Sequence, residues 1–221
     1  MGSGGLSSLQ ARVLELLAGM EPPWTLTGGA ALVGFHLHHR QTRDLDLFWR
    51  GEDRLGVWRD EVVRRLIVAG LSVEPLHSSD SFQRLSAGDG RETVIIDLVA
   101  DPVAAVEPAA ELVHGRARIR VDTTHEILVN KLCTLLGRAE FRDLVDVRAL
   151  LAAGGDLARA LQDAPRKDGG FSPLTLAWLL RGLPVGVMAS EEGVGAPEAG
   201  ALERFRDDLV ARLTEAARPG A

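Results

Sequence analysis

The chain has 221 residues, of which 46% are hydrophobic and 25% are charged, and its formal net charge is −6. This balance excludes a disordered chain, and the negative charge argues against wholesale wrapping by nucleic acid. No apolar run approaches the roughly 20 residues of a membrane span, and the single cysteine, Cys133, excludes an internal disulfide. With no signal-peptide pattern in the first residues, we expect a cytoplasmic protein without a membrane partner.

Helical spacing begins early in the chain. Apolar residues recur at intervals of three and four over residues 6–19, which predicts a helix that ends at Gly19. Pro22-Pro23 then interrupts the chain, and residues 24–27 predict a short strand. An apolar helix is expected directly after Gly28-Gly29.

The clearest single clue is the alternating run Asp44-Leu45-Asp46-Leu47-Phe48. On a strand, alternate side chains share a face, so both acids point one way and both leucines point into the core. Two ionised carboxylates about 7 Å apart repel each other, and a hard divalent cation is the natural group to lie between them. The alternative is an exposed strand whose solvent face is acidic.

The diglycine step, Gly28-Gly29, favours the cation site over the acidic surface. Glycines at the start of a helix leave backbone N–H groups free to face an anion, and the helix dipole favours negative charge there. A phosphate site beside a metal site indicates a nucleoside triphosphate bound with Mg²⁺ or Mn²⁺.

The rest of the chain alternates between strand and helix patterns before it becomes helical. In chain order we expect a helix over 54–69, strands over 71–76, 81–86 and 92–99 with a hairpin turn at 88–90, a connector over 102–110, a strand over 117–121, helices over 125–137, 156–163 and 173–180, a Gly/Pro/Ala-rich loop over 183–200, and a charged helix over 201–217.

The order of strand, Gly28-Gly29, helix, His39-Arg40 and Arg43-Asp44-Leu45-Asp46-Leu47-Phe48 resembles the nucleotidyltransferase superfamily. Within it, the pattern is similar to the AbiEii/AbiGii branch, the toxin component of type IV toxin–antitoxin systems. The resemblance implies an α+β nucleotidyltransferase fold, in which helices flank a small mixed β-sheet. It places the core over residues 1–122 and a C-terminal helical subdomain over 123–221. One departure is Ala30, where the family usually has a hydroxyl that helps to hold a phosphate.

The resemblance also implies which residues form the site. The superfamily brings a third carboxylate on a later, adjacent strand, and Asp97 fits that position, although a chance surface aspartate is the alternative and Asp101 is the fallback. The family places a phosphate-contacting lysine at Lys131, whose alternative is a side chain that covers core. Its Arg-Asp-x-x-Asp segment favours Asp143 over Asp146. The expected site therefore has metal ligands Asp44, Asp46 and Asp97, phosphate-binding residues Gly28, Gly29, Arg40 and Arg43, and further catalytic residues Lys131 and Asp143.

The expected activity is transfer of a nucleoside monophosphate from a nucleoside triphosphate to an acceptor hydroxyl. By resemblance, the acceptor is a tRNA 3′ end or another RNA, and the partner is a cognate antitoxin. Two alternatives stay open. One is a catalytically silent module that binds nucleotide or protein, which Ala30 favours, and the other is a small-molecule enzyme of the antibiotic-modifying type.

Overall fold

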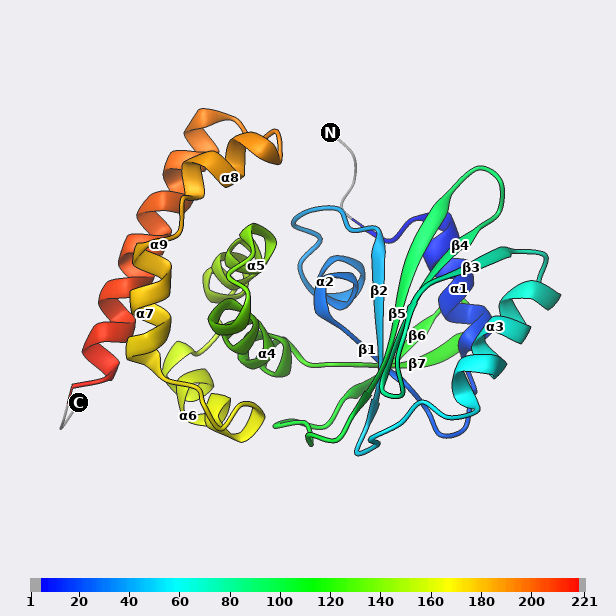
Figure 1. Cartoon of the computed structure of the whole chain (residues 1–221). Coiled ribbons are helices and arrows are strands. Elements are labelled where there is room, and N and C mark those ends of the chain that lie inside the picture. Colours follow the sequence, from blue (N-terminus) through cyan, green and yellow to red (C-terminus); the bar gives the residue numbers. More distant parts are fainter. Residues whose placement is uncertain (1–4, 219–221) are drawn as a thin grey trace. The chain divides into compact units, whose positions relative to one another are not determined.

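The computed structural model describes residues 5–218 (Figure 1), and the chain divides into two compact units. The first unit is Met1–Ile127 and the second is Leu128–Ala221. The division falls inside helix α4 (Thr124–Gly137), whereas the sequence analysis placed it after residue 122. The first unit contains a mixed sheet flanked by helices, which is the fold class expected from the sequence.

The sheet of the first unit has seven strands within the described residues, in the order β3-β4-β5-β2-β1-β7-β6. The strands are β1 (Thr25–Thr27), β2 (Asp44–Arg50), β3 (Ser72–Ser78), β4 (Phe82–Gly88), β5 (Thr93–Asp101), β6 (Ala110–His114) and β7 (Ala117–Val121). The acidic strand β2 is therefore central. It runs antiparallel to β1 and parallel to β5.

The two faces of β2 have different environments, as the alternation predicts. Leu45, Leu47 and Trp49 are buried, while Asp44 and Asp46 are partly exposed on the opposite face. The buried face packs against helices because its apolar side chains must leave water. The acidic face is therefore the side of this strand on which polar chemistry is available.

Helices α1 (Ser8–Leu17) and α3 (Trp58–Val68) cover the apolar face, as Figure 1 shows. Trp58 of α3 stacks on Trp49 of β2 with ring centroids 6.0 Å apart. On the other side of the sheet lie the short helix α2 (Gly28–Ala31) and the π-helix η1 (Leu32–His36) that continues it (Figure 1). This continuous helical segment begins at the diglycine, as expected.

The second unit is helical throughout its regular structure. After the end of α4, its helices are α5 (Phe141–Ala152), α6 (Leu157–Lys167), α7 (Pro173–Arg181), α8 (Val185–Glu191) and α9 (Ala196–Ala216). Among residues 5–218 no single helix is long and apolar enough to cross a bilayer, although α7 and α8 pass that test as a pair bent by 67°.

Two local expectations were wrong. The segment 183–200 is not a loop, because α8 and the start of α9 lie within it. Val185 and Ala189 are buried there, so tertiary packing outweighs the Gly/Pro-rich composition. Pro197 stands in the first turn of α9, where a backbone N–H would have no intrahelical partner, so its missing N–H costs nothing. Strand β6 lies where no strand was expected. It is an edge strand with little burial, so its sequence carries no apolar alternation.

Candidate active site

Two neighbouring strands, β2 and β5, bring the expected acids to one face of the sheet. Asp44 and Asp46 lie two residues apart on β2, and Asp46 is directly in register with Asp97 on β5. Residues in register on adjacent strands point to the same face and lie about 4.8 Å apart. Asp97 is only 7% exposed, so its carboxylate needs a positive or hydrogen-bonding partner.

The diglycine packs directly against this acidic face. Gly28 has a left-handed φ of +62°, and a Cβ atom at this position would lie 2.4 Å from Oδ2 of Asp46. A Cβ at Gly29 would lie 2.6 Å from Nη2 of Arg40. Position 28 therefore requires glycine, because its φ is left-handed as well as its contact close, whereas at position 29 the end of the Arg40 side chain would have to shift. The turn lies with one glycine against an acid and the other against an arginine.

Asp97 has a basic partner that the sequence analysis did not identify. Arg84 of β4 is in register with Asp97, and its guanidinium donates two hydrogen bonds to that carboxylate. The distances are 2.8 Å from Nε to Oδ1 and 2.6 Å from Nη2 to Oδ2. The hydrogen bonds to Asp97, followed by the negative charges of Asp97, Asp44 and Asp46, raise the pKa of Arg84 above its ordinary value. The sequence carried one signal for this pairing, because the hairpin turn predicted at 88–90 sets the register that places Arg84 opposite Asp97.

The expected convergence of three carboxylates is absent from this arrangement. Across residues 5–218, no three His, Cys, Asp or Glu side chains are placed together so that they could hold a metal ion. The physical reason is Arg84, because both oxygens of Asp97 face its guanidinium. The donor set still fits a hard cation, since Asp44 and Asp46 offer carboxylate oxygens on one face. Asp97 can join them only by exchanging its partner.

Lys131 and Asp143 lie in the second unit, where they form a buried ion cluster with Asp146. The ammonium of Lys131 lies 2.6 Å from Oδ1 of Asp143 and 2.8 Å from Oδ2 of Asp146. Lys131 is 8% exposed and both acids are at most 1% exposed. Burial alone would lower the pKa of Lys131, but the two carboxylates outweigh it and the pKa is raised. Both acids of the Arg-Asp-x-x-Asp segment thus orient the lysine, and Arg138 also contacts Asp143, with its Nε 3.3 Å away.

The remaining predicted residues are placed as follows. Arg40 lies beside Gly29, and its Nη1 donates to the carbonyl of Gln41 at 2.9 Å. Arg43 is exposed immediately before Asp44. Ala30 is fully buried in α2, so its methyl group belongs to the core of the unit. The ring nitrogen Nε2 of His36 lies 2.9 Å from the backbone carbonyl oxygen of Asp122.

A second charged network, not anticipated from the sequence, lies at the end of β2. Arg50 pairs with Asp101, with Asp122 at 2.8 Å and with Glu126 at 3.5 Å. Burial raises the pKa of Asp122 above its ordinary value. Glu126 accepts a hydrogen bond from the backbone N–H of Val106 at 2.7 Å, so it fixes the connector between β5 and β6. Asp101, the fallback for the third carboxylate, is therefore engaged in this network.

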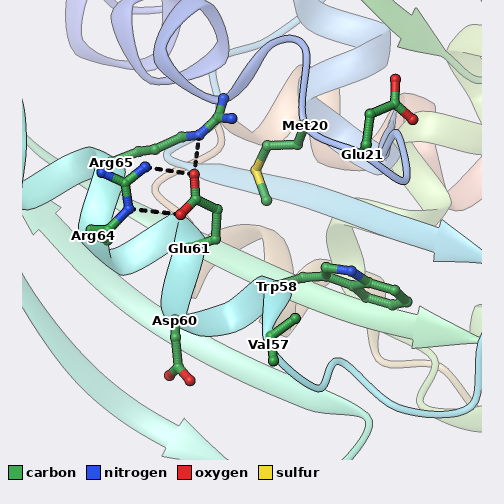
Figure 2. A pocket seen from close by; sticks show the side chains of 8 residues that line it. All are labelled: Met20, Glu21, Val57, Trp58, Asp60, Glu61, Arg64 and Arg65. Carbon is green, nitrogen blue, oxygen red and sulfur yellow. Dashed lines mark hydrogen bonds and ion pairs between the residues drawn. The ribbon is translucent and has the colours of Figure 1, made fainter.

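A cavity of about 600 Å³ lies on the opposite face of the sheet from the acids. Its lining residues are Met20, Glu21, Val57, Trp58, Asp60, Glu61, Arg64 and Arg65 (Figure 2). Glu61 accepts hydrogen bonds from Arg64 and Arg65, which lower its pKa to about 2. Because Trp58 stacks on the apolar side of β2, this cavity is separate from the acidic site.

The comparison with protein families decides the identity. A model of the nucleotidyl transferase AbiEii toxin of type IV toxin–antitoxin systems matches residues 12–215. The chain belongs to the AbiEii family.

Solved structures show that this AbiEii-family chain shares its fold with known proteins. JHP933 from Helicobacter pylori matches with a TM-score of 0.52 at 19% identity, over 94% of this chain and 90% of that one. A second H. pylori protein, provisionally named a nucleotidyltransferase, matches with a TM-score of 0.50 at 19% identity, over 97% and 100%. The antibiotic-resistance factor ANT(2″)-Ia in solution matches with a TM-score of 0.50 at 15% identity, over 72% and 90%. No match was found among curated proteins.

Proposed function

We propose that this AbiEii-family protein is a divalent-metal-dependent enzyme that transfers a nucleoside monophosphate from a nucleoside triphosphate to an acceptor hydroxyl. The observation that carries the proposal is the contact between the diglycine turn and the acidic face, where Gly28 leaves room for the carboxylate of Asp46. Asp46 in turn is in register with Asp97. Backbone donors for phosphate and oxygen donors for a cation therefore lie side by side.

In this proposal the two ends of the triphosphate site have different residues. The N–H groups of Gly28 and Gly29 bind the β- and γ-phosphates, and Arg40 and Arg43 add positive charge. Asp44 and Asp46 would hold Mg²⁺ or Mn²⁺, and Asp97 would be the third ligand if its carboxylate were released from Arg84. The cation, when bound, supplies charge neutralisation for the attacking hydroxyl and the leaving pyrophosphate.

The transfer step is an in-line displacement. The acceptor oxygen forms a bond to the α-phosphorus, the bond between that phosphorus and the bridging oxygen breaks, and pyrophosphate leaves. Asp97 accepts the hydroxyl proton, a role that requires its oxygens to be released from Arg84. Lys131 and Asp143 form their ion pair within the second unit, and a catalytic role for that pair stays a prediction from the family resemblance.

Membership of the AbiEii family supports a toxin role, and the acceptor is proposed from the resemblance. We assign an RNA acceptor, with the 3′ end of a tRNA as the first candidate, and a growth-arresting action in the cytoplasm that a cognate antitoxin restrains. The family name supports the toxin role. The fold shared with ANT(2″)-Ia does not decide between an RNA and a small-molecule acceptor, because one fold serves many acceptors.

The test is a labelling experiment with each of the four α-³²P-labelled nucleoside triphosphates. The protein is incubated with Mg²⁺ and either total RNA or a panel of aminoglycosides, and the Asp44→Ala variant is the control. We expect label on RNA with the native protein and none with Asp44→Ala. Label on aminoglycosides alone would refute the RNA acceptor. Tight binding of nucleotide without pyrophosphate release under any acceptor would favour the silent module that Ala30 suggested.

A further inference from the structure

Arg84 places a positive charge beside the carboxylates of the acidic face. It lies on β4, directly across from Asp97, and β5 in turn places Asp97 directly across from Asp46. The guanidinium contacts both oxygens of Asp97, at 2.8 and 2.6 Å. A planar guanidinium matches a carboxylate in this two-bond geometry, which a lysine cannot reproduce.

The two partners of this pair differ in how firmly they are held. The side chain of Asp97 is 9% exposed, whereas that of Arg84 is 47% exposed. The carboxylate is therefore fixed in the sheet, and the guanidinium can move into solvent without unpacking any core. The arginine therefore neutralises a buried carboxylate and still has a path into solvent.

We propose that Arg84 competes with the divalent cation for Asp97, so that the protein without nucleotide keeps its third carboxylate out of the metal site and binds the cation weakly. This inference rests on the proposed function and adds to it a positioning residue outside the predicted site. With Arg84 in place, both oxygens of Asp97 are engaged by its guanidinium, while the carboxylates of Asp44 and Asp46 lie on the same face of the sheet. A triphosphate brings its own oxygen ligands and negative charge, and thereby offers both the cation and the guanidinium new partners.

The experiment measures binding of Mn²⁺ alone to the full chain by electron paramagnetic resonance, which counts free Mn²⁺. The first variant is Arg84→Gln, which removes the guanidinium and keeps a side chain of similar length at a half-exposed position. We expect the dissociation constant for Mn²⁺ to fall about tenfold, because the cation no longer has to displace the guanidinium from Asp97. The change is limited to about tenfold because solvent weakens a charge-assisted pair whose arginine is half exposed. Thermal unfolding of each variant confirms that the fold is retained.

Two controls separate exchange at Asp97 from a general effect of charge. Arg118→Gln removes the same charge from a side chain on β7 that is 80% exposed, and it should leave Mn²⁺ affinity unchanged. Asp97→Asn and the double variant Arg84→Gln/Asp97→Asn complete a double-mutant cycle. If the gain acts through Asp97, Arg84→Gln produces no gain when residue 97 is Asn.

The outcomes are distinct from those of the labelling experiment. Unchanged or weaker Mn²⁺ binding by Arg84→Gln would overturn the inference, and so would a gain that persists in the Asp97→Asn background. Either result leaves the proposed transferase intact if the native protein still labels its acceptor. Loss of labelling together with Mn²⁺ binding that Asp44→Ala does not change would instead defeat the proposed function.

Discussion

Gly28→Ala should separate the stability of the diglycine turn from its role at the acidic face. Residue 28 has φ +62°, and an alanine in this left-handed region is strained by about 1–2 kcal/mol. The added Cβ would also lie 2.4 Å from Oδ2 of Asp46, where ordinary contacts begin at 3.4 Å. The carboxylate must therefore move by about 1 Å, a displacement that can reduce a rate about 100-fold.

Gly51→Ala is the matched control for this prediction. Gly51 has φ +80°, so alanine is strained there too, but nothing lies within 4 Å of its would-be Cβ. Both variants should unfold a few degrees lower, at about 2–4 °C per kcal/mol. Only Gly28→Ala should lose pyrophosphate release from nucleoside triphosphate. Equal release rates for the two variants would refute the reasoning that the turn positions Asp46.

The other predictions concern buried charges and a helix cap. Lys131→Met should destabilise the second unit by about 3–5 kcal/mol in chemical denaturation, because it leaves two buried carboxylates uncompensated. Since those carboxylates raise the pKa of Lys131 above 10.5, its stabilising effect should be complete below that pH and should disappear as the pH rises through the folded-state pKa. Asp122→Asn should be neutral or stabilising at neutral pH. Burial raises the pKa of Asp122 from 3.8, so the ionised carboxylate is less stable in the folded chain than in the unfolded chain. Its ionisation therefore lowers the free energy of unfolding as the pH rises from 3.8 through the folded-state pKa. Arg50→Met should instead cost about 3 kcal/mol, and a gain in unfolding temperature would contradict this. Thr123→Ala should cost about 1 kcal/mol, because the hydroxyl of Thr123 accepts from the N–H of Glu126 at 3.1 Å.

The sequence was most informative where one local pattern determined the outcome. The alternation from Asp44 to Phe48 predicted a strand with two acids on one face, and β2 has that pattern of burial. The resemblance to the superfamily implied that Asp97 lies on a strand adjacent to β2, and the register places it opposite Asp46. Gly28-Gly29 predicted a strand-to-helix turn, which the structure contains.

The sequence was least informative where long-range pairing determined the outcome. The partner of Asp97 depends on the register across the β4–β5 hairpin, and Arg84 stands in a segment with no motif of its own. The network of Arg50 joins strand ends more than 50 residues apart. Helix α8 forms in a Gly/Pro-rich stretch because Val185 and Ala189 are buried against neighbouring helices. Local propensity cannot show such burial.

Release of pyrophosphate by Asp46→Asn, beside the native protein under the same Mg²⁺ and nucleotide, tests the central assignment most directly. The side chains are nearly equal in size, so the unfolding temperature should stay the same while the rate falls by about 100-fold or more. An undiminished rate would show that this acid takes no part in the chemistry. Loss of the fold in this variant would show that the acid serves the structure instead.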